Sequence, residues 1–197
     1  MEELVDLLNE NGTKIGVIDK KEAHKKGLWH RVVHVWIMNS KNELLIQKRS
    51  CQKSFFPNVW DVSVGGHVDA GESSIDASVR EVFEEIGVKL KPNELEFLFS
   101  FADSNIYDGV LVNEIADVFL VRKDVEISKL KYQSEEVETT KWIGFDEFLK
   151  KCYTNEFLPH TKGYEKFEEW LKANGLVSNW KCYKKWETNT LTSVSFL

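Results

Sequence analysis

One stretch, residues 66–88, constrains this chain more than any other part of the sequence. It reads GHVDAGESSIDASVREVFEEIGV, in which two glycine-containing turns lead into an amphipathic segment. Apolar residues recur there at helical spacing, so the pattern predicts a helix over Ser73–Ile86. Ser73 or Ser74 can cap the start of this helix, and Gly87 is placed to end it. The chain is therefore expected to fold around a helix whose polar face is strongly acidic.

The acidic face of this helix has the character of a cation site. Glu81 and Glu85 share one face, and Glu84 lies beside them. Without cations, like charges at these spacings destabilise a helix by roughly a few tenths of a kcal/mol per pair. Carboxylate oxygens are hard ligands that suit Mg²⁺ or Mn²⁺, and phosphate oxygens complete the coordination. The pattern predicts a divalent-metal site formed by the three glutamates and by the carbonyl of Gly66, which no side chain shields.

Residues that flank the glutamates support this interpretation. Arg80 lies four positions before Glu84 and can also hold Glu72, which precedes the helix. A water-facing acidic helix is the alternative, but it does not need the flanking glycines and arginine in this register. We therefore assign structural roles to Glu72 and Gly87, and we expect Arg80 to take part in catalysis with the glutamates.

The full pattern is a glycine, five residues, a glutamate, seven residues, and then R-E-apolar-x-E-E-x-G-apolar. It matches the Nudix box without a gap or a substitution, so the chain resembles the Nudix hydrolases. The resemblance implies an α/β (α+β) fold, namely a Nudix-type α/β/α sandwich with a mixed central sheet. It also implies a diphosphatase or pyrophosphohydrolase that uses Mg²⁺ or Mn²⁺. Its substrate would be a nucleoside diphosphate linked to another moiety, or a similar diphosphate metabolite.

The rest of the sequence fits such a fold, because predicted strands precede, separate and follow predicted helices. At the start we expect a two-residue turn at Asn11-Gly12 between strands Leu4–Leu8 and Lys14–Ile18, and then a charged connector, Asp19–Lys26. Later strands are predicted at Trp29–Met38, Leu44–Lys48, Val59–Val64, Leu95–Phe101, Val110–Val121 and Glu138–Ile143. A polar loop is expected at Asp103–Gly109, and helices at Phe145–Tyr153 and Tyr164–Ala173.

The domain organisation follows from this order. We predict a single Nudix domain over residues 1–173, which begins with a β-hairpin in residues 1–20 and contains the box at 66–88. Residues 174–197 carry Trp180, Tyr183, Trp186 and Phe196 and are too apolar for a free tail. We expect this C-terminal extension to pack on the domain or on a partner.

Composition narrows the class of protein. Of the 197 residues, 42% are hydrophobic, which is enough for the core of one domain, and the net charge of -6 makes nucleic acid a poor partner. The acidic start is not expected to act as a secretory signal, and no apolar run is long enough to cross a membrane. Three scattered cysteines predict free thiols in a reducing cytoplasm. A small-molecule diphosphate is the expected partner, and a homodimer stays open.

A narrower resemblance appears upstream of the box. Glu22-Ala23-His24, Leu28-Trp29-His30-Arg31, Leu44–Arg49, Lys53–Pro57 and Trp60–His67 resemble the branch that includes isopentenyl diphosphate isomerase. In that enzyme two early histidines, a third histidine after a Cys-Gly pair, and acidic residues bind a divalent metal. The resemblance places these ligands at His24, His30, His67, Glu85 and Glu114, and it places the residues that hold the substrate's diphosphate at Arg49 and Lys53.

Two departures separate this chain from the isomerase. The isomerase needs a cysteine directly before the Gly-His pair, and that position is Gly65 here. The isomerase resembles a Nudix protein whose box has decayed, whereas this box keeps its three glutamates. Both departures favour hydrolysis. An isomerase acting on isopentenyl diphosphate and a non-catalytic module that binds a diphosphate or nucleotide are the alternatives.

Other polar residues are harder to interpret. Glu114 falls among apolar residues of a predicted strand, so we expect it to bind metal or to act as a general base. Either Glu81 or Glu114 can accept the proton of the attacking water, and spacing alone does not choose between them. We interpret His34 as structural, His160 as a loop residue, and the pair Glu135-Glu136 as solvated loop charges.

Overall fold

The computed structural model describes residues 3–107 and 109–177. Seven strands form one sheet: β3 (His30–Met38), β4 (Glu43–Arg49), β5 (Trp60–Asp61), β6 (Val64–His67), β7 (Leu95–Tyr107), β8 (Val110–Arg122) and β9 (Val137–Gly144). The strand order is β5-β4-β3-β8-β7, with β6 paired to β3 and β9 paired to β4. β3 and β8 are parallel, and the other pairs are antiparallel. The sheet is therefore mixed, as predicted.

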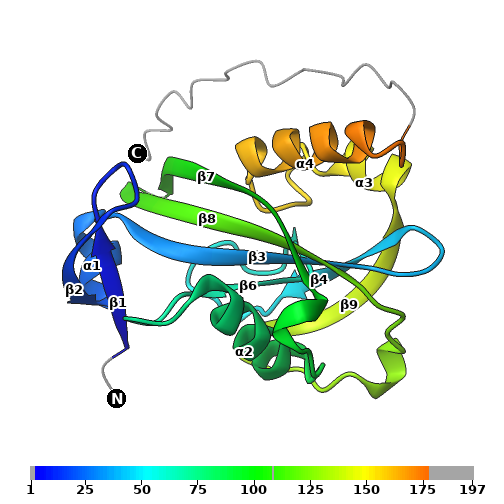
Figure 1. Cartoon of the computed structure of the whole chain (residues 1–197), viewed down its shortest axis with the longest axis horizontal. Coiled ribbons are helices and arrows are strands. Elements are labelled where there is room, and N and C mark those ends of the chain that lie inside the picture. The colour runs from blue at the N-terminus through cyan, green and yellow to red at the C-terminus, as the bar shows by residue number, and fades with distance from the viewer. Residues whose placement is uncertain (1–2, 108, 178–197) are drawn as a thin grey trace, which may run out of the picture.

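Helices cover both faces of this sheet (Figure 1). One face holds α2 (Ser74–Ile86), and the opposite face holds α3 (Phe145–Lys151) and α4 (Thr161–Ala173). A smaller hairpin of β1 (Leu4–Leu8) and β2 (Lys14–Asp19) lies at one end with α1 (Lys20–Lys26). Two short 3₁₀ helices complete the fold, η1 (Pro92–Glu94) and η2 (Ile127–Lys129). The predicted α/β/α sandwich is confirmed.

The alternation of side chains along β3 divides the core into its two halves. Val35 and Ile37 are fully buried on the α2 side, where they join Val82 and Ile86 of that helix. Trp36 points the other way, and its ring stacks on Phe167 of α4 at a centroid distance of 4.6 Å. Each such side chain contributes about 1.5–3 kcal/mol when it is buried. β3 is thus fixed firmly from both sides, which matters because it carries part of the candidate site.

The box forms a strand, a turn and a helix. β6 ends at His67, and α2 begins after Ser73, whose hydroxyl accepts a hydrogen bond from the backbone N–H of Asp76 at 3.1 Å. Gly87 ends the helix in a left-handed conformation, with φ of 74°. The predicted helix boundaries are therefore confirmed to within one residue.

The expected connector over Asp19–Lys26 is wrong, because residues 20–26 form α1. Asp19 caps this helix: its carboxylate accepts hydrogen bonds from the N–H groups of Lys21 and Glu22 at 2.9 and 3.2 Å. Gly27 ends it with φ of 60°. The helix is anchored by Ala23, which is fully buried. An aspartate before the segment and a glycine after it were the signals that the prediction missed.

Three further boundaries differ from the predictions. The polar loop expected at residues 103–109 is largely strand, because β7 continues to Tyr107 and pairs with β8 as far as Val110. The single strand expected at residues 59–64 is two short strands, β5 on β4 and β6 on β3. The hairpin turn spans residues 9–13, where the side chain of Asn9 accepts hydrogen bonds from the backbone of Asn11 and Thr13.

The C-terminal extension falls mostly outside the described residues, which end at residue 177. The part that is described packs on the domain, since Leu176 and Val177 contact the α4 side of the core. Residues 178–197, including Trp180, Tyr183, Trp186 and Phe196, lie beyond it. None of the helices in the described ranges is long and apolar enough to cross a membrane.

Candidate active site

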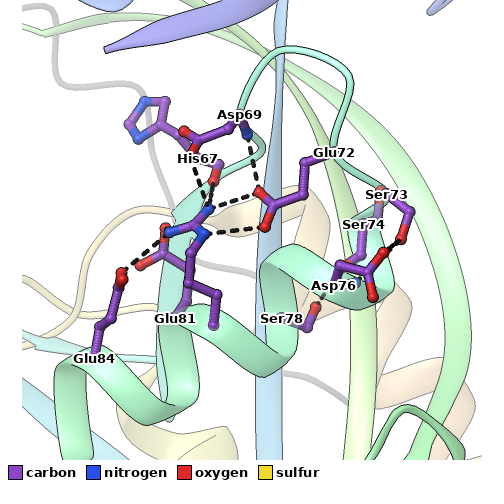
Figure 2. A network of polar contacts seen from close by, with 10 residues as sticks. His67, Asp69, Glu72, Ser73, Ser74, Asp76, Ser78, Glu81 and Glu84 are labelled. Atoms are coloured by element: carbon purple, nitrogen blue, oxygen red, sulfur yellow. Dashed lines mark hydrogen bonds and ion pairs between the residues drawn. The ribbon is translucent and has the colours of Figure 1, made fainter. Parts of the chain in front are cut away.

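Acidic side chains from α2 and the turn before it converge, as Figure 2 shows for Glu72, Glu81 and Glu84, and Arg80 joins them by hydrogen bonds. Its guanidinium donates two parallel hydrogen bonds to Glu72, at 3.0 and 2.8 Å. It also donates to Glu81 at 2.7 Å and to Glu84 at 3.1 Å. We call Glu72, Glu81, Glu84 and Glu85 with Arg80 the acidic cluster. A fifth hydrogen bond, from Arg80 to the backbone carbonyl of His67 at 2.9 Å, links this cluster to β6.

Gly66 makes room for one carboxylate of this cluster. A Cβ atom at Gly66 would lie 2.1 Å from Cδ of Glu81, a distance that no real side chain tolerates. Glu81 therefore rests directly on the backbone of β6. Burial raises the pKa of Glu81 to about 6, although the positive charge of Arg80 acts in the opposite direction. A carboxyl group with such a pKa can exchange protons near neutral pH.

Glu85 is the least satisfied member of the acidic cluster. Only 3% of the residue is exposed, and its Oε2 atom has no hydrogen-bond partner. Burial, and then the negative charge of neighbouring Glu81, raise its pKa well above the usual value. A buried carboxylate without a partner is unfavourable unless a cation or a proton reaches it. The charge of Lys53 acts on Glu85, but Oε2 receives no hydrogen bond, so the position suits a cation that contacts this oxygen directly.

A second group of ligand atoms comes from four separate elements. His24 on α1, His30 on β3, His67 on β6 and Glu114 on β8 each offer one atom, and these atoms all lie within 4.8 Å of one another. We call them the histidine cluster. Strand register explains their meeting: β3 pairs His30 with Glu114 of β8 on one side, and it pairs Val32 with His67 of β6 on the other. Residues two apart on a strand share a face, so the three side chains converge.

The protonation of the histidine cluster suits a metal ion. Nδ1 of His30 lies 2.9 Å from the carbonyl of Leu28, which only accepts, so this nitrogen carries a proton and Nε2 is the ring atom left for a metal. That Nε2 is buried without a hydrogen-bond partner, 3.7 Å from the carboxylate of Glu114. Burial lowers the pKa of His24, and it lowers the pKa of His67 further. Neutral imidazole is the form that binds metals.

Glu114 completes this second group as an anion. Burial alone favours the neutral acid, but the neighbouring imidazoles of His30 and His67 lower the pKa of Glu114 to about 2. Three nitrogen donors and one carboxylate form a donor set that transition metals accept. The residues present therefore fit a bound divalent cation.

Arg49 and Lys53 lie near the acidic cluster but already have partners. Arg49 donates hydrogen bonds to the carbonyls of Phe55 and Phe56, at 2.9 and 3.0 Å, and it contacts Asp61 at 3.3 Å. Lys53 forms an ion pair with Glu136. Glu136 is therefore not a solvated loop charge, as the sequence suggested, but a partly buried member of an ion pair beside the site.

A third polar group was missed by sequence reasoning. It consists of Asp61 on β5, His34 on β3 and His160, which directly precedes α4. His34 lies four residues after His30 on β3, and residues an even number apart on a strand share a face. This alternation was the sequence signal that could have linked His34 to the candidate site. His160 and Asp61 are far from β3 in sequence, so only the fold brings them together.

Comparisons with known proteins agree with this architecture. The NUDIX domain family matches residues 28–171. Nudix hydrolase 3 of Arabidopsis thaliana is 38% identical over 153 residues, a match that covers 75% of this chain but 20% of that protein. The isopentenyl-diphosphate Delta-isomerase of Shigella boydii is 34% identical over 151 residues, covering 75% of this chain and 80% of the enzyme. The crystal structure of DR0079 from Deinococcus radiodurans superposes with a TM-score of 0.67 at 27% identity, covering 84% of this chain and 98% of that one.

Proposed function

We propose that this chain, which belongs to the Nudix hydrolase family, cleaves the diphosphate of a small molecule with the help of divalent cations. The observation that carries the proposal is the buried carboxylate of Glu85, which has no partner on Oε2 and lies beside Glu81. Such a carboxylate is unfavourable in the protein alone and becomes favourable when a cation binds it. Mg²⁺ and Mn²⁺ suit the oxygen ligands of this cluster.

The acidic cluster supplies the residues that would hold these cations, namely Glu81, Glu84, Glu85 and the carbonyl of Gly66. Bound there, the cations would screen the charge of the diphosphate, acidify a water molecule and stabilise the oxygen that leaves. Arg80 holds Glu72, Glu81 and Glu84 in place by direct hydrogen bonds. We assign it this positioning role in catalysis.

Glu81 is the better candidate for the proton acceptor. Its pKa of about 6 allows its carboxylate to take a proton near neutral pH. The pKa of Glu114 is about 2, so its carboxylate is a weak base. Two carboxyl groups whose surroundings separate their pKa values usually serve different roles. We therefore assign the proton transfer to Glu81, in addition to its place among the cation ligands, and metal binding alone to Glu114.

The histidine cluster is proposed as a separate metal site. Its three imidazoles favour a transition metal over Mg²⁺. The test is the metal content of the purified protein after dialysis. His30→Gln is expected to lose roughly one tightly bound ion, because metal sites depend on each ligand. Glu81→Gln serves as the matched variant and should retain that ion. Equal metal contents in both variants would contradict two independent sites.

Arg49 and Lys53 are proposed to hold the diphosphate, as the family resemblance implies. Lys53 is close enough to Glu85 for its positive charge to act on the pKa of that carboxyl group. Arg49 retains N–H donors beyond the three that it uses for Phe55, Phe56 and Asp61, since a guanidinium carries five. Both cations can therefore face an anionic ligand without losing their present partners.

The isomerase alternative is weaker on chemical grounds, although the relatives include an isomerase by name. Proton transfer at carbon needs an acid or base at position 65, and this chain has glycine there. The atom nearest to this position from His34 is a ring carbon, 3.7 Å from where a Cβ would lie. Nothing at that position replaces a thiol.

A screen of phosphate release across a panel of diphosphates tests the proposal. The panel should contain nucleotide sugars, dinucleoside polyphosphates, coenzyme A and prenyl diphosphates, each with Mg²⁺, with Mn²⁺ and with a chelator. Turnover that depends on the cation is expected for at least one compound. An assay of double-bond migration in isopentenyl diphosphate runs in parallel. Binding without any turnover would instead favour a non-catalytic module.

A further inference from the structure

Asp61 is a buried carboxylate that the hydrolytic mechanism proposed above does not use. Only 3% of the residue is exposed. Nη1 of Arg49 donates a hydrogen bond to Oδ2 of Asp61 at 3.3 Å, and Nε2 of His160 lies 3.4 Å from Oδ1. The backbone N–H of Val62 also donates to Oδ1, at 2.7 Å. Each carboxylate oxygen therefore has a partner, and one of these partners is Arg49, a cation that the proposed function places on the diphosphate of the substrate.

The pairing of β5 explains why these three side chains meet. β5 pairs Asp61 with Gln47 of β4, and Arg49 follows Gln47 by two residues, so Asp61 and Arg49 lie on the same face of the sheet. β5 also makes backbone hydrogen bonds to residues 156–158, at 2.8 and 2.9 Å. This segment leads directly to His160. β5 thus lies between the strand that carries Arg49 and the segment that carries His160.

The two partners of Asp61 keep its carboxyl group ionised. Burial raises the pKa of Asp61, but His160 and then Arg49 lower it by more. Besides burial and the charge of Glu81, the charge of Asp61 raises the pKa of Glu85, so Asp61 lies within electrostatic range of the acidic cluster. Replacing a buried ion pair by apolar residues is often neutral or stabilising, so stability alone does not explain this ion pair. Its position beside the acidic cluster favours a role in the reaction.

Arg49 links Asp61 to the loop that carries Lys53. Nε and Nη2 of Arg49 donate hydrogen bonds to the carbonyls of Phe56 and Phe55, at 3.0 and 2.9 Å. Phe56 has a left-handed backbone conformation, with φ of 49°, which is unfavourable for a residue other than glycine. The two hydrogen bonds stabilise this shape of the loop. A guanidinium that Asp61 holds in one orientation therefore also fixes the loop of Lys53, the second cation proposed to bind the diphosphate.

From these contacts we infer that Asp61, supported by His160, is a positioning residue that orients the guanidinium of Arg49 toward the diphosphate of the substrate. The inference rests on the proposed function, in which Arg49 and Lys53 hold that diphosphate. A guanidinium is a planar fork that binds phosphate oxygens in parallel pairs, so its orientation decides how well it binds. Three of its five N–H groups are used within the protein, and two remain for the anion. A side chain that is fixed before binding loses less conformational freedom, which strengthens binding.

A double-mutant cycle tests this inference, with calorimetry of methylenediphosphonate in the presence of Mn²⁺ as the measurement. Asp61→Asn keeps the shape of the side chain but removes the charge that pairs with Arg49, so it should weaken binding about tenfold. Arg49→Gln should weaken binding by at least the same factor. The double variant should bind as weakly as Arg49→Gln alone, because Asp61 is proposed to act only through Arg49.

A purely structural role for Asp61 predicts a different pattern. It would lower the temperature of thermal unfolding, and any losses of affinity from the two variants would multiply in the double variant. His160→Phe keeps an aromatic ring but removes both nitrogens, so it should weaken binding about threefold in the wild type and not at all in the Arg49→Gln background. This variant decides the question if Asp61→Asn does not fold. Glu165→Gln, an exposed change on α4, is the matched control and should bind the probe as the wild type does.

The outcomes separate this inference from the proposed function. If methylenediphosphonate binds but Asp61→Asn keeps the wild-type affinity, or weakens binding equally with and without Arg49, the inference is wrong and the hydrolase proposal stands. If Arg49→Gln keeps the wild-type affinity, Arg49 does not hold the diphosphate, and the inference is wrong together with that assignment. If the wild-type protein does not bind the probe in the presence of Mn²⁺, the diphosphate site itself is wrong.

Discussion

The acidic cluster and the histidine cluster both hold several possible metal ligands close together, but they limit electrostatic repulsion between these ligands in different ways. The acidic cluster collects its charged side chains from residues 72–85, within one helix and the turn before it. The histidine cluster collects four donors from residues 24–114, on four separate elements. The first relies on an internal cation, Arg80, to hold carboxylates together. The second relies on neutral rings that need no counter-charge to approach one another.

This difference determines how each cluster is expected to respond to a metal ion. Three carboxylates around one guanidinium form an arrangement that is already neutralised in part, so a metal ion must compete with Arg80 for Glu81 and Glu84. Glu85 has no such partner on Oε2. In the histidine cluster, Nε2 of His30 is buried without a partner and is ready to bind. We therefore expect the acidic cluster to exchange its ions with the substrate and the histidine cluster to retain its ion.

The largest expected effect is the loss of turnover when the acidic cluster loses a charge. Glu81→Gln removes the proposed proton acceptor and should lower kcat by about 10²–10⁴-fold, the range that a positioned acid or base contributes. Glu85→Gln removes a cation ligand of the same shape and should lower kcat by a similar factor, because the cation stabilises the charge of the transition state. Steady-state kinetics on any substrate found by the screen provides the measurement. Glu165→Gln, exposed on α4, is the control and should keep the parent rate. A parent rate in either box variant would show that the acidic cluster is not the reaction centre.

Substitutions at the adjacent glycines Gly65 and Gly66 test whether the acidic cluster needs the close contact between Glu81 and β6. Gly66→Ala should displace the carboxylate of Glu81, because the new Cβ would lie 2.1 Å from its Cδ, and a displacement of about 1 Å lowers turnover by about 10²-fold. Gly65→Ala is the matched control, since its Cβ meets only ordinary contacts of 3.6–3.7 Å. We expect kcat to fall in the first variant and to change little in the second. Similar kcat values in both variants would mean that the contact between Gly66 and Glu81 is not needed.

The contrast between the clusters also explains what the sequence could predict. The grouping of Glu81, Glu84 and Glu85 could be predicted because helical spacing alone puts them on one face. The contact between Arg80 and Glu84 could be predicted from the same spacing. The sandwich fold follows from the order of strands and helices. The convergence of His24, His30, His67 and Glu114 depends on strand register, so it was available only through the family resemblance. Even that resemblance left α1 unpredicted, although α1 carries His24.

The group formed by Asp61, His34 and His160 could not be predicted from the sequence. His34 fits the rhythm of a buried strand, which favours a structural interpretation, and His160 follows a proline in what reads as a loop. Their contact depends on how α4 packs across the sheet, and packing of that kind has no local sequence signal. Asp61 was not singled out because one aspartate in a short strand is uninformative. Burial and proximity, not residue type, identify this group.

The smallest expected effect is on stability, and here the two clusters should have opposite pH dependence in the metal-free protein. The pKa of Glu85 is raised above its usual 4.5 by burial, so its contribution to stability is present below that value and is lost as the pH rises through the raised pKa. The pKa of His67 is lowered below its usual 6.5 by burial, so its contribution is present above 6.5 and is lost as the pH falls toward the lowered pKa.

Urea unfolding with a chelator at pH 8 and pH 5.5 measures this difference. Glu85→Gln should raise the free energy of unfolding by about 1 kcal/mol at pH 8, because it removes a buried charge without a partner, and the gain should shrink at pH 5.5. His67→Gln should show the reverse, with its more favourable effect at pH 5.5. Saturating Mn²⁺ should cancel the advantage of Glu85→Gln, because the ion stabilises only the protein that retains the carboxylate. If each variant shifted stability equally at both pH values, the buried groups would titrate as they do in water, and the distinction between a strained acidic cluster and a neutral histidine cluster would be lost.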